Sequence, residues 1–120
     1  MAGKGLVPAE TFVQKIKAAV DARRDGDFVI IARTDAIAVE GFEQAIERAN
    51  LYGDAGADVV FVEAPETEAQ AAAVPGAVSC PALYNWCYGG KSPLLPAAEV
   101  AAMGYKFILF TDALYAVSKT

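Results

Sequence analysis

The sequence predicts an α/β fold in which parallel strands alternate with helices, and three observations support this prediction. Short runs of β-branched and aromatic residues show no polar alternation, which is typical of strands that are covered on both faces. Amphipathic stretches with apolar residues at helical spacing lie between these runs. Gly56 and Gly104 each end such a stretch directly before an apolar run, as in a compact helix-to-strand connection.

Four segments are predicted to be strands: residues 28–32, 58–62, 77–84 and 105–110. The first two consist mainly of apolar β-branched residues, so we expect both of their faces to be buried. The third is weaker because Pro81 interrupts it, and proline donates no hydrogen bond to a sheet. The spacing predicts four parallel strands with helices on one outer side, forming an open sheet or half of a barrel.

Four helices are predicted around these strands: residues 8–24, 41–52, 66–73 and 96–103. The first has Pro8 and Glu10 in its opening turn, and Asp25-Gly26-Asp27 ends it. The second turns an apolar face to the core and places Arg48 at its solvated edge. The two shorter helices come immediately before the third and fourth strands, which completes the alternation.

Composition narrows the class of protein. The 120 residues are 55% hydrophobic and 21% charged, which fits one globular domain and excludes a disordered chain. The net charge is -5 and no basic cluster occurs, so we expect no nucleic-acid partner. No apolar run approaches the ~18 residues of a membrane helix, so no membrane association is expected. Two cysteines make no disulfide framework, which favours the reducing cytoplasm.

Polar residues at the ends of the predicted strands are the candidate site, because parallel α/β folds bind ligands there. Arg33 follows the first strand, and it either pairs with Asp35 or Glu63 or holds a substrate carboxylate. Glu63 follows the second strand and either orients Arg33 or acts on a ligand. Asn85 follows the third strand, where it either contacts a ligand or caps a turn. The chain has no histidine, so carboxylates, Lys, Arg, Tyr or Cys would have to carry any catalysis.

The segment after the third strand contains weaker candidates. Gly89-Gly90-Lys91-Ser92 has glycines and a lysine as phosphate loops do, but the long spacing of such loops is missing. Cys87 has no histidine to activate it as a nucleophile. Trp86 and Tyr88 are more typical of packing or rim residues than of ligand contacts.

Six stretches, in this order and spacing, resemble the isocitrate lyase / phosphoenolpyruvate mutase superfamily: residues 3–8, 15–23, 28–36, 55–65, 85–93 and 97–110. The likeness is to its methylisocitrate lyase-like and carboxyphosphonoenolpyruvate mutase-like members. The resemblance implies a TIM-barrel-type (β/α) fold and a Mg²⁺-bound small oxo- or hydroxy-carboxylate that reacts as an enolate-like species. It also implies roles for Arg33 as the substrate-binding arginine, for Glu63 near the metal shell, and for Asn85 as a substrate contact. Gly89 and Gly90, in the matching stretch 85–93, are included among the expected substrate-binding residues.

The sequence also departs from the family pattern. The family's metal-binding aspartates and its Lys-x-Cys-Gly-His loop belong before the segment that matches Met1 to Lys4, so no metal ligand is assigned here. Residues 1–120 are therefore expected to be the C-terminal half of a barrel, and to lack the family's terminal helices that subunits often exchange. Asn85-Trp86-Cys87-Tyr88 stands where the family often has Asn-x-Thr-Glu, which leaves the substrate open.

These expectations point to part of a Mg²⁺-dependent C–C lyase for small oxo- or hydroxy-carboxylates, inactive by itself. A phosphonate or carboxyphosphonate mutase and an oxo-acid decarboxylase or hydrolase of the same superfamily are alternatives. A non-catalytic α/β module that binds a carboxylate or a protein is a third, so whether this chain is itself an enzyme stays open. Four strands would leave open sheet edges and apolar surface, which predicts a homo-oligomer or association through the exposed half-barrel surface.

Overall fold

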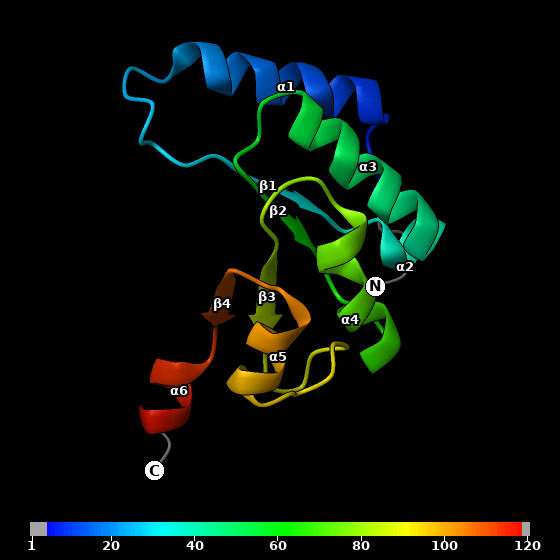
Figure 1. Ribbon diagram of the computed structural model, residues 1–120, viewed down its shortest axis with the longest axis vertical. Coiled ribbons are helices and arrows are strands. Elements are labelled where there is room, and N and C mark those ends of the chain that lie inside the picture. Colours follow the sequence, from blue (N-terminus) through cyan, green and yellow to red (C-terminus); the bar gives the residue numbers. More distant parts are fainter. Residues whose placement is uncertain (1–4, 119–120) are drawn as a thin grey trace.

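The computed structural model describes residues 5–118, and it confirms the prediction of an α/β fold with parallel strands (Figure 1). In chain order the elements are α1 (Ala9–Ala22), β1 (Ile31–Thr34), α2 (Ile37–Glu40), α3 (Phe42–Asp54), β2 (Val59–Val62), α4 (Glu68–Ala77), β3 (Leu83–Trp86), α5 (Ala97–Met103), β4 (Phe107–Phe110) and α6 (Ala113–Ser118). The short helices α2 and α6 were not predicted. No helix in this part of the chain has the length and apolar character that crossing a bilayer requires.

Neighbouring strands follow one another in the chain. β1 pairs in parallel with β2, and β3 pairs in parallel with β4. A single parallel bridge between Val60 and Ala82 joins the two pairs, with the Val60 N–H donating to the Pro81 carbonyl at 3.0 Å. The spatial order is therefore β1-β2-β3-β4, and the carboxyl ends of all four strands lie at the same edge.

The two faces of the strands have different surroundings, because successive side chains of a strand point to opposite faces. Val60, Val62 and Tyr84 belong to the main core, which includes residues of α2, α3, α4 and α5. Val59, Phe61 and Leu83 form a separate apolar cluster. These three residues are only 3–7% exposed, but their neighbours Ile31, Phe107 and Leu109 are 43–48% exposed. We call the whole set, which no helix of the main core covers in the described part of the chain, the open face: Ile31, Val59, Phe61, Leu83, Phe107 and Leu109. The helices thus cover one side, as predicted.

The start of the first strand differs from the prediction. Phe28 and Val29 lie outside β1 and are 66% and 51% exposed, so the expectation of a strand from residue 28 with two buried faces is wrong. The reason is a side-chain latch. Arg23 Nη1 donates to the Phe28 carbonyl at 3.0 Å and to Asp58 Oδ2 at 2.7 Å, and the Ile30 N–H donates to the same carboxylate oxygen at 2.9 Å. These side chains satisfy the backbone groups that a strand would otherwise pair.

The third strand also begins later than predicted: Ala77 is the last residue of α4, and residues 78–82 form the connection to β3. Asn50 of α3 holds this connection. Its Nδ2 donates to the Ala77 carbonyl at 3.0 Å, and its Oδ1 accepts from the Ser79 N–H at 3.0 Å. Pro81 therefore lies just before the strand, where the missing N–H removes no bond from the ladder.

Helix α4 continues beyond its predicted end at residue 73. Thr67 caps its start by accepting from the Gln70 N–H at 3.1 Å. Pro75 lies inside the helix and lacks the N–H that would donate to the Ala71 carbonyl. The Tyr105 hydroxyl donates to that carbonyl instead, at 2.7 Å, in a buried position. A tertiary contact therefore supplies the donor that proline removed, and the helix can run to Ala77.

Candidate functional site

The polar candidates converge at the carboxyl ends of the strands. Arg33 is the third residue of β1, Asn85 is the third residue of β3, and Glu63 directly follows β2. The parallel registers place these positions at one edge, with Arg33 opposite Phe61 and Asn85 opposite Leu109. Three of the five predicted site residues are thus brought together.

Arg33 is an ion-pair residue and also part of an exposed surface. Its Nε donates to Asp35 Oδ1 at 2.6 Å and its Nη2 donates to Asp35 Oδ2 at 3.1 Å. Glu63 is a more distant partner, with 3.9 Å between Arg33 Nη2 and Glu63 Oε2. The guanidinium carbon lies 5.2 Å from the centre of the Phe61 ring, and 52% of the side chain is exposed. The hydrogen bond to Asp35 raises the pKa of Arg33 above its ordinary value, and this effect outweighs partial burial, which by itself would lower the pKa.

Asn85 links Glu63 to the fourth strand. Its Nδ2 donates to Glu63 Oε2 at 3.4 Å, and Thr111 Oγ1 lies 3.1 Å from Asn85 Oδ1. An amide oxygen can only accept, so the Thr111 hydroxyl is the donor in that contact, and the amide nitrogen turns toward Glu63. We call the resulting set the polar row: Asp35, Arg33, Glu63, Asn85 and Thr111.

Thr111 was not among the predicted site residues. It lies directly after β4, as Glu63 lies directly after β2. The signal that could have found it is therefore the same one, a polar residue that closes an apolar strand. The polar row consequently draws on all four strands.

The backbone beside Glu63 has an unusual conformation. Its N–H donates to the Thr34 carbonyl at 2.9 Å, which extends the pairing of β1 and β2 by one residue. Ala64 then has a φ of 57°, in the left-handed region that residues other than glycine rarely adopt, and Pro65 follows. The chain thus leaves the strand immediately after Glu63 through a strained residue. Strained backbone of this kind is common next to functional residues.

The two predicted glycines lie in a different place. Gly89 and Gly90 belong to an exposed turn after β3, which the Gly90 N–H closes by donating to the Cys87 carbonyl at 3.3 Å. Asp112 anchors this turn by accepting from the Tyr88 N–H at 2.7 Å. None of the contacts found among residues 5–118 joins either glycine to the polar row, so their ligand role stays a prediction.

Trp86 has a packing role. Its Nε1 donates to the Leu95 carbonyl at 2.9 Å, and its ring contacts the rings of Tyr88 and Phe110 at centroid distances of 5.2 and 5.7 Å.

The carboxylates of the polar row do not form a magnesium centre by themselves. Mg²⁺ needs octahedral oxygen ligands, commonly one or two carboxylates with water. Within the described range no group of three or more His, Cys, Asp or Glu side chains is placed to hold a metal ion. Both carboxylate oxygens of Asp35 already accept from Arg33, and Glu63 Oε2 lies near Arg33 and Asn85. We therefore derive no chemical step through a metal from these residues.

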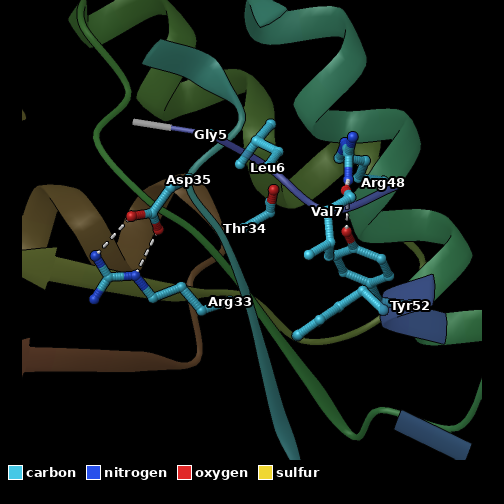
Figure 2. Close-up of a pocket in the computed structure, with 9 residues that line it drawn as sticks. Gly5, Leu6, Val7, Arg33, Thr34, Asp35, Arg48 and Tyr52 are labelled. Atoms are coloured by element: carbon cyan, nitrogen blue, oxygen red, sulfur yellow. Dashed lines mark hydrogen bonds and ion pairs between the residues drawn. The ribbon is translucent and has the colours of Figure 1, made fainter. Parts of the chain in front are cut away.

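A cavity of about 300 Å³ separates the Arg33–Asp35 pair from a second arginine (Figure 2). Arg48 of α3 donates to both carboxylate oxygens of Glu40 at 2.9 Å, to the Val7 carbonyl at 2.9 Å and to the Tyr52 hydroxyl at 3.3 Å. Only 11% of its side chain is exposed, so the prediction that Arg48 lies at a solvated edge is wrong. The pairing raises the pKa of Arg48 and lowers the pKa of Glu40.

Comparison with known proteins assigns the chain to a family. The phosphoenolpyruvate phosphomutase family matches residues 1–119. The chain belongs to this family. One stretch of the resemblance begins at Gly3 and Lys4, which lie outside the residues that the structure describes.

Individual relatives from the phosphomutase family support the assignment. The chain is 42% identical over 120 residues to 2,3-dimethylmalate lyase of Eubacterium barkeri, covering 99% of this chain and 42% of that protein. It is 44% identical over 116 residues to the probable 2-methylisocitrate lyase 2 of Corynebacterium glutamicum, covering 97% and 38%. The chain thus spans about two-fifths of the length of these curated relatives.

Solved structures agree with the predicted fold. Oxaloacetate acetylhydrolase in complex with the inhibitor 3,3-difluorooxalacetate matches with a TM-score of 0.92 and 38% identity, covering 99% of this chain and 41% of that one. The structure of 2,3-dimethylmalate lyase, a member of the PEP mutase/isocitrate lyase superfamily, matches with a TM-score of 0.90 and 38% identity, covering 98% and 42%. The superfamily resemblance and the TIM-barrel-type α/β fold are therefore confirmed.

Proposed function

We propose that this chain provides the carboxylate-binding strand ends of a Mg²⁺-dependent C–C lyase that acts on small oxo- or hydroxy-carboxylates. The convergence of Arg33, Glu63 and Asn85 at one edge of four parallel strands is the observation that carries this proposal. The names of two relatives, 2,3-dimethylmalate lyase and 2-methylisocitrate lyase, favour the lyase reaction.

Each residue of the polar row has a chemical role in this proposal. Cleavage of a C–C bond beside a carbonyl or carboxylate leaves the electron pair on an enolate-like fragment, whose negative charge needs nearby donors. Arg33 binds the substrate carboxylate through guanidinium N–H groups. The Asn85 amide nitrogen adds a neutral donor. Glu63 holds this amide by accepting from it at 3.4 Å, and it makes a longer ionic contact of 3.9 Å with Arg33.

Magnesium belongs to the proposal for the whole protein. A solved phosphonopyruvate hydrolase in complex with oxalate and Mg²⁺ matches this chain with a TM-score of 0.77 and 31% identity, covering 99% of this chain and 46% of that one. When bound, such an ion would supply additional positive charge to the developing enolate.

Hydrolysis of an oxo-acid is a second candidate, and a specific observation favours it. Oxaloacetate acetylhydrolase matches with a TM-score of 0.92, which is as high as the match to 2,3-dimethylmalate lyase. In addition, Trp86-Cys87-Tyr88 replaces the x-Thr-Glu that often follows the family asparagine, close to where a substrate would contact Asn85.

The test compares substrates and a single variant in the complete reading frame that contains these 120 residues. kcat/KM is measured with Mg²⁺ for 2,3-dimethylmalate, 2-methylisocitrate and oxaloacetate. Arg33→Lys should lower kcat/KM about 100-fold or more, because one ammonium group cannot replace a two-pronged guanidinium. Glu63→Gln should also lower turnover, and Asn85→Ala should mainly raise KM. Arg24→Lys, at an exposed arginine, is the matched control.

The outcomes separate the candidates. Cleavage of either hydroxy-acid supports a lyase, and activity on oxaloacetate alone supports a hydrolase. A folded Arg33→Lys variant with near-normal kcat/KM would show that Arg33 is a structural ion-pair residue, and the proposal would fail. Circular dichroism establishes that each variant is folded.

We further propose that residues 1–120 correspond to the C-terminal half of a family barrel and associate through the open face. The coverage of about two-fifths of each relative supports this. So do the four strands found within residues 5–118, where a whole barrel has eight. Ile31, Phe107 and Leu109 are apolar and 43–48% exposed there. Sedimentation of the 120-residue chain as a concentration-independent monomer would contradict association. A cytoplasmic location completes the proposal, since Cys80 and Cys87 are both free thiols, and cell fractionation tests it.

A further inference from the structure

We propose that Asp35 is a positioning residue that determines which edge of the Arg33 guanidinium is presented to a carboxylate ligand. This inference rests on the proposed function, because it concerns the same arginine. It resolves the choice that the sequence left open, between Arg33 as an ion-pair residue and Arg33 as a carboxylate fork, since the two roles use different edges of one group.

The hydrogen bonds of Arg33 divide the guanidinium into two edges. Asp35 accepts from Nε at 2.6 Å and from Nη2 at 3.1 Å, so it occupies the side edge of the fork. A guanidinium has five N–H donors, of which this pair uses two. The end edge, formed by Nη1 and the second N–H of Nη2, is the remaining two-pronged donor that a carboxylate can accept from.

The surroundings of Asp35 suit a fixed partner. Its side chain is 17% exposed, against 52% for that of Arg33, so the carboxylate is the better packed of the two groups. The backbone after it is held by the Ala36 N–H, which donates to Thr34 Oγ1 at 3.2 Å, and Ala36 itself is fully buried. A ligand that approached Arg33 would therefore meet a guanidinium whose side edge is already held by a well-packed carboxylate.

Phe61 and Glu63 complete the orientation. The guanidinium carbon lies 5.2 Å from the centre of the Phe61 ring, on the open face of the strands. Glu63 lies 3.9 Å from Nη2, which is beyond hydrogen-bond distance, so Asp35 is the dominant carboxylate partner. With Asp35 on one edge and Phe61 beneath, rotation of the group about its last side-chain bonds is restricted.

The experiment observes the orientation of Arg33 directly and uses the full protein. The Nε–Hε signal of Arg33 in a ¹H–¹⁵N NMR spectrum is assigned by its loss in Arg33→Lys. In the unsubstituted protein we expect this signal to be protected from exchange with water, because Nε–H is bonded to Asp35. Asp35→Asn should expose it to exchange and weaken oxalate binding about tenfold, measured by calorimetry with Mg²⁺ present. Asp35→Glu, which keeps the charge, should restore part of both.

The controls and outcomes are distinct. Asp21→Asn, at an exposed carboxylate of α1, should change neither the signal nor the affinity. An unchanged Arg33 signal in folded Asp35→Asn overturns the inference, as does an unchanged oxalate affinity, which would reduce the contact to a structural ion pair. Failure of the unsubstituted protein to bind oxalate overturns the proposed function and the inference with it. Where Asp35→Asn does not fold, the same two measurements on Asp35→Ser, which also removes the carboxylate, decide, with an unshifted signal and affinity counting against the inference.

Discussion

The two arginines on opposite sides of the cavity in Figure 2 make the same kind of ion pair in very different surroundings. Arg48 and Arg33 each donate two hydrogen bonds to one carboxylate, Glu40 and Asp35 respectively. Arg48 donates further to a backbone carbonyl and a tyrosine hydroxyl, and 11% of its side chain is exposed. Arg33 lies over an aromatic ring and is 52% exposed.

Because both arginines make such a pair, an ion pair alone does not distinguish a structural arginine from the carboxylate-binding arginine that we propose Arg33 to be. Arg48 connects the N-terminal segment, α2 and α3 through Val7, Glu40 and Tyr52, so its donors are directed to the protein itself. Arg33 is held along one edge only, by Asp35, and it lies near the carboxyl end of β1 with about half of its side chain exposed. The two arginines differ in the number of their acceptors and in their degree of burial, which is the difference that the proposed roles require.

The largest expected effects come from the same substitution at the two arginines, which should reduce stability at Arg48 and turnover at Arg33. Arg48→Lys should lower the midpoint of thermal unfolding on the order of 5 °C, because one ammonium cannot serve acceptors on three elements. Its kcat/KM, measured on the same substrates, should stay within about 3-fold of the parent when compared below the unfolding transition. Arg33→Lys should do the opposite, losing turnover while its midpoint stays within about 2 °C. If both variants lost activity equally, the division between the two arginines would break down.

A second prediction concerns a buried hydrogen bond far from the polar row, between the Tyr105 hydroxyl and the Ala71 carbonyl, which should contribute to stability. Tyr105→Phe should lower the free energy of unfolding by about 1–3 kcal/mol. The reason is that the buried Ala71 carbonyl would lose the hydroxyl donor that takes the place of the N–H missing at Pro75. Tyr88→Phe, at a side chain that is 64% exposed, should change it by less than about 0.5 kcal/mol. Urea unfolding measures both variants. Equal stabilities would mean that the hydroxyl does not support α4.

The smallest expected effect concerns the Arg23–Asp58 latch at the amino ends of the strands. The Ile30 N–H and then Arg23 hold the pKa of Asp58 below its ordinary value. A lowered pKa means that the contribution of Asp58 to stability is present above the unfolded pKa of about 3.9 and is lost as the pH falls through the folded value. Asp58→Asn should therefore cost less than about 1 kcal/mol at pH 7, since the pair is partly exposed.

Urea unfolding from pH 7 to pH 3 tests the direction of this effect. The difference between the parent and Asp58→Asn should stay constant down to about pH 4 and shrink below it. Asp21→Asn serves as the exposed control. A difference that grew on acidification would contradict the assignment of the latch.

Much of the fold could be predicted from the sequence, because the information is local. Unalternated apolar runs with intervening amphipathic stretches predicted four parallel strands in chain order, and glycines marked the helix ends. The search for polar residues at the ends of those runs selected Arg33, Glu63 and Asn85 as candidate site residues. Since parallel strands share one carboxyl edge, their proximity followed from chain position without knowledge of side-chain contacts.

Contacts between distant residues decided the rest. The late start of β1 depends on a latch between residues that are 35 positions apart, and the passage of α4 through Pro75 depends on a hydroxyl 34 positions from its acceptor. The burial of Arg48 required Val7 and Glu40 to meet it, although the pattern around it was that of a solvated helix edge. Local sequence determines where a strand or a helix is possible. Which backbone groups and charges are satisfied there is settled only when tertiary structure brings their partners within hydrogen-bond distance, because water is their alternative partner until that point.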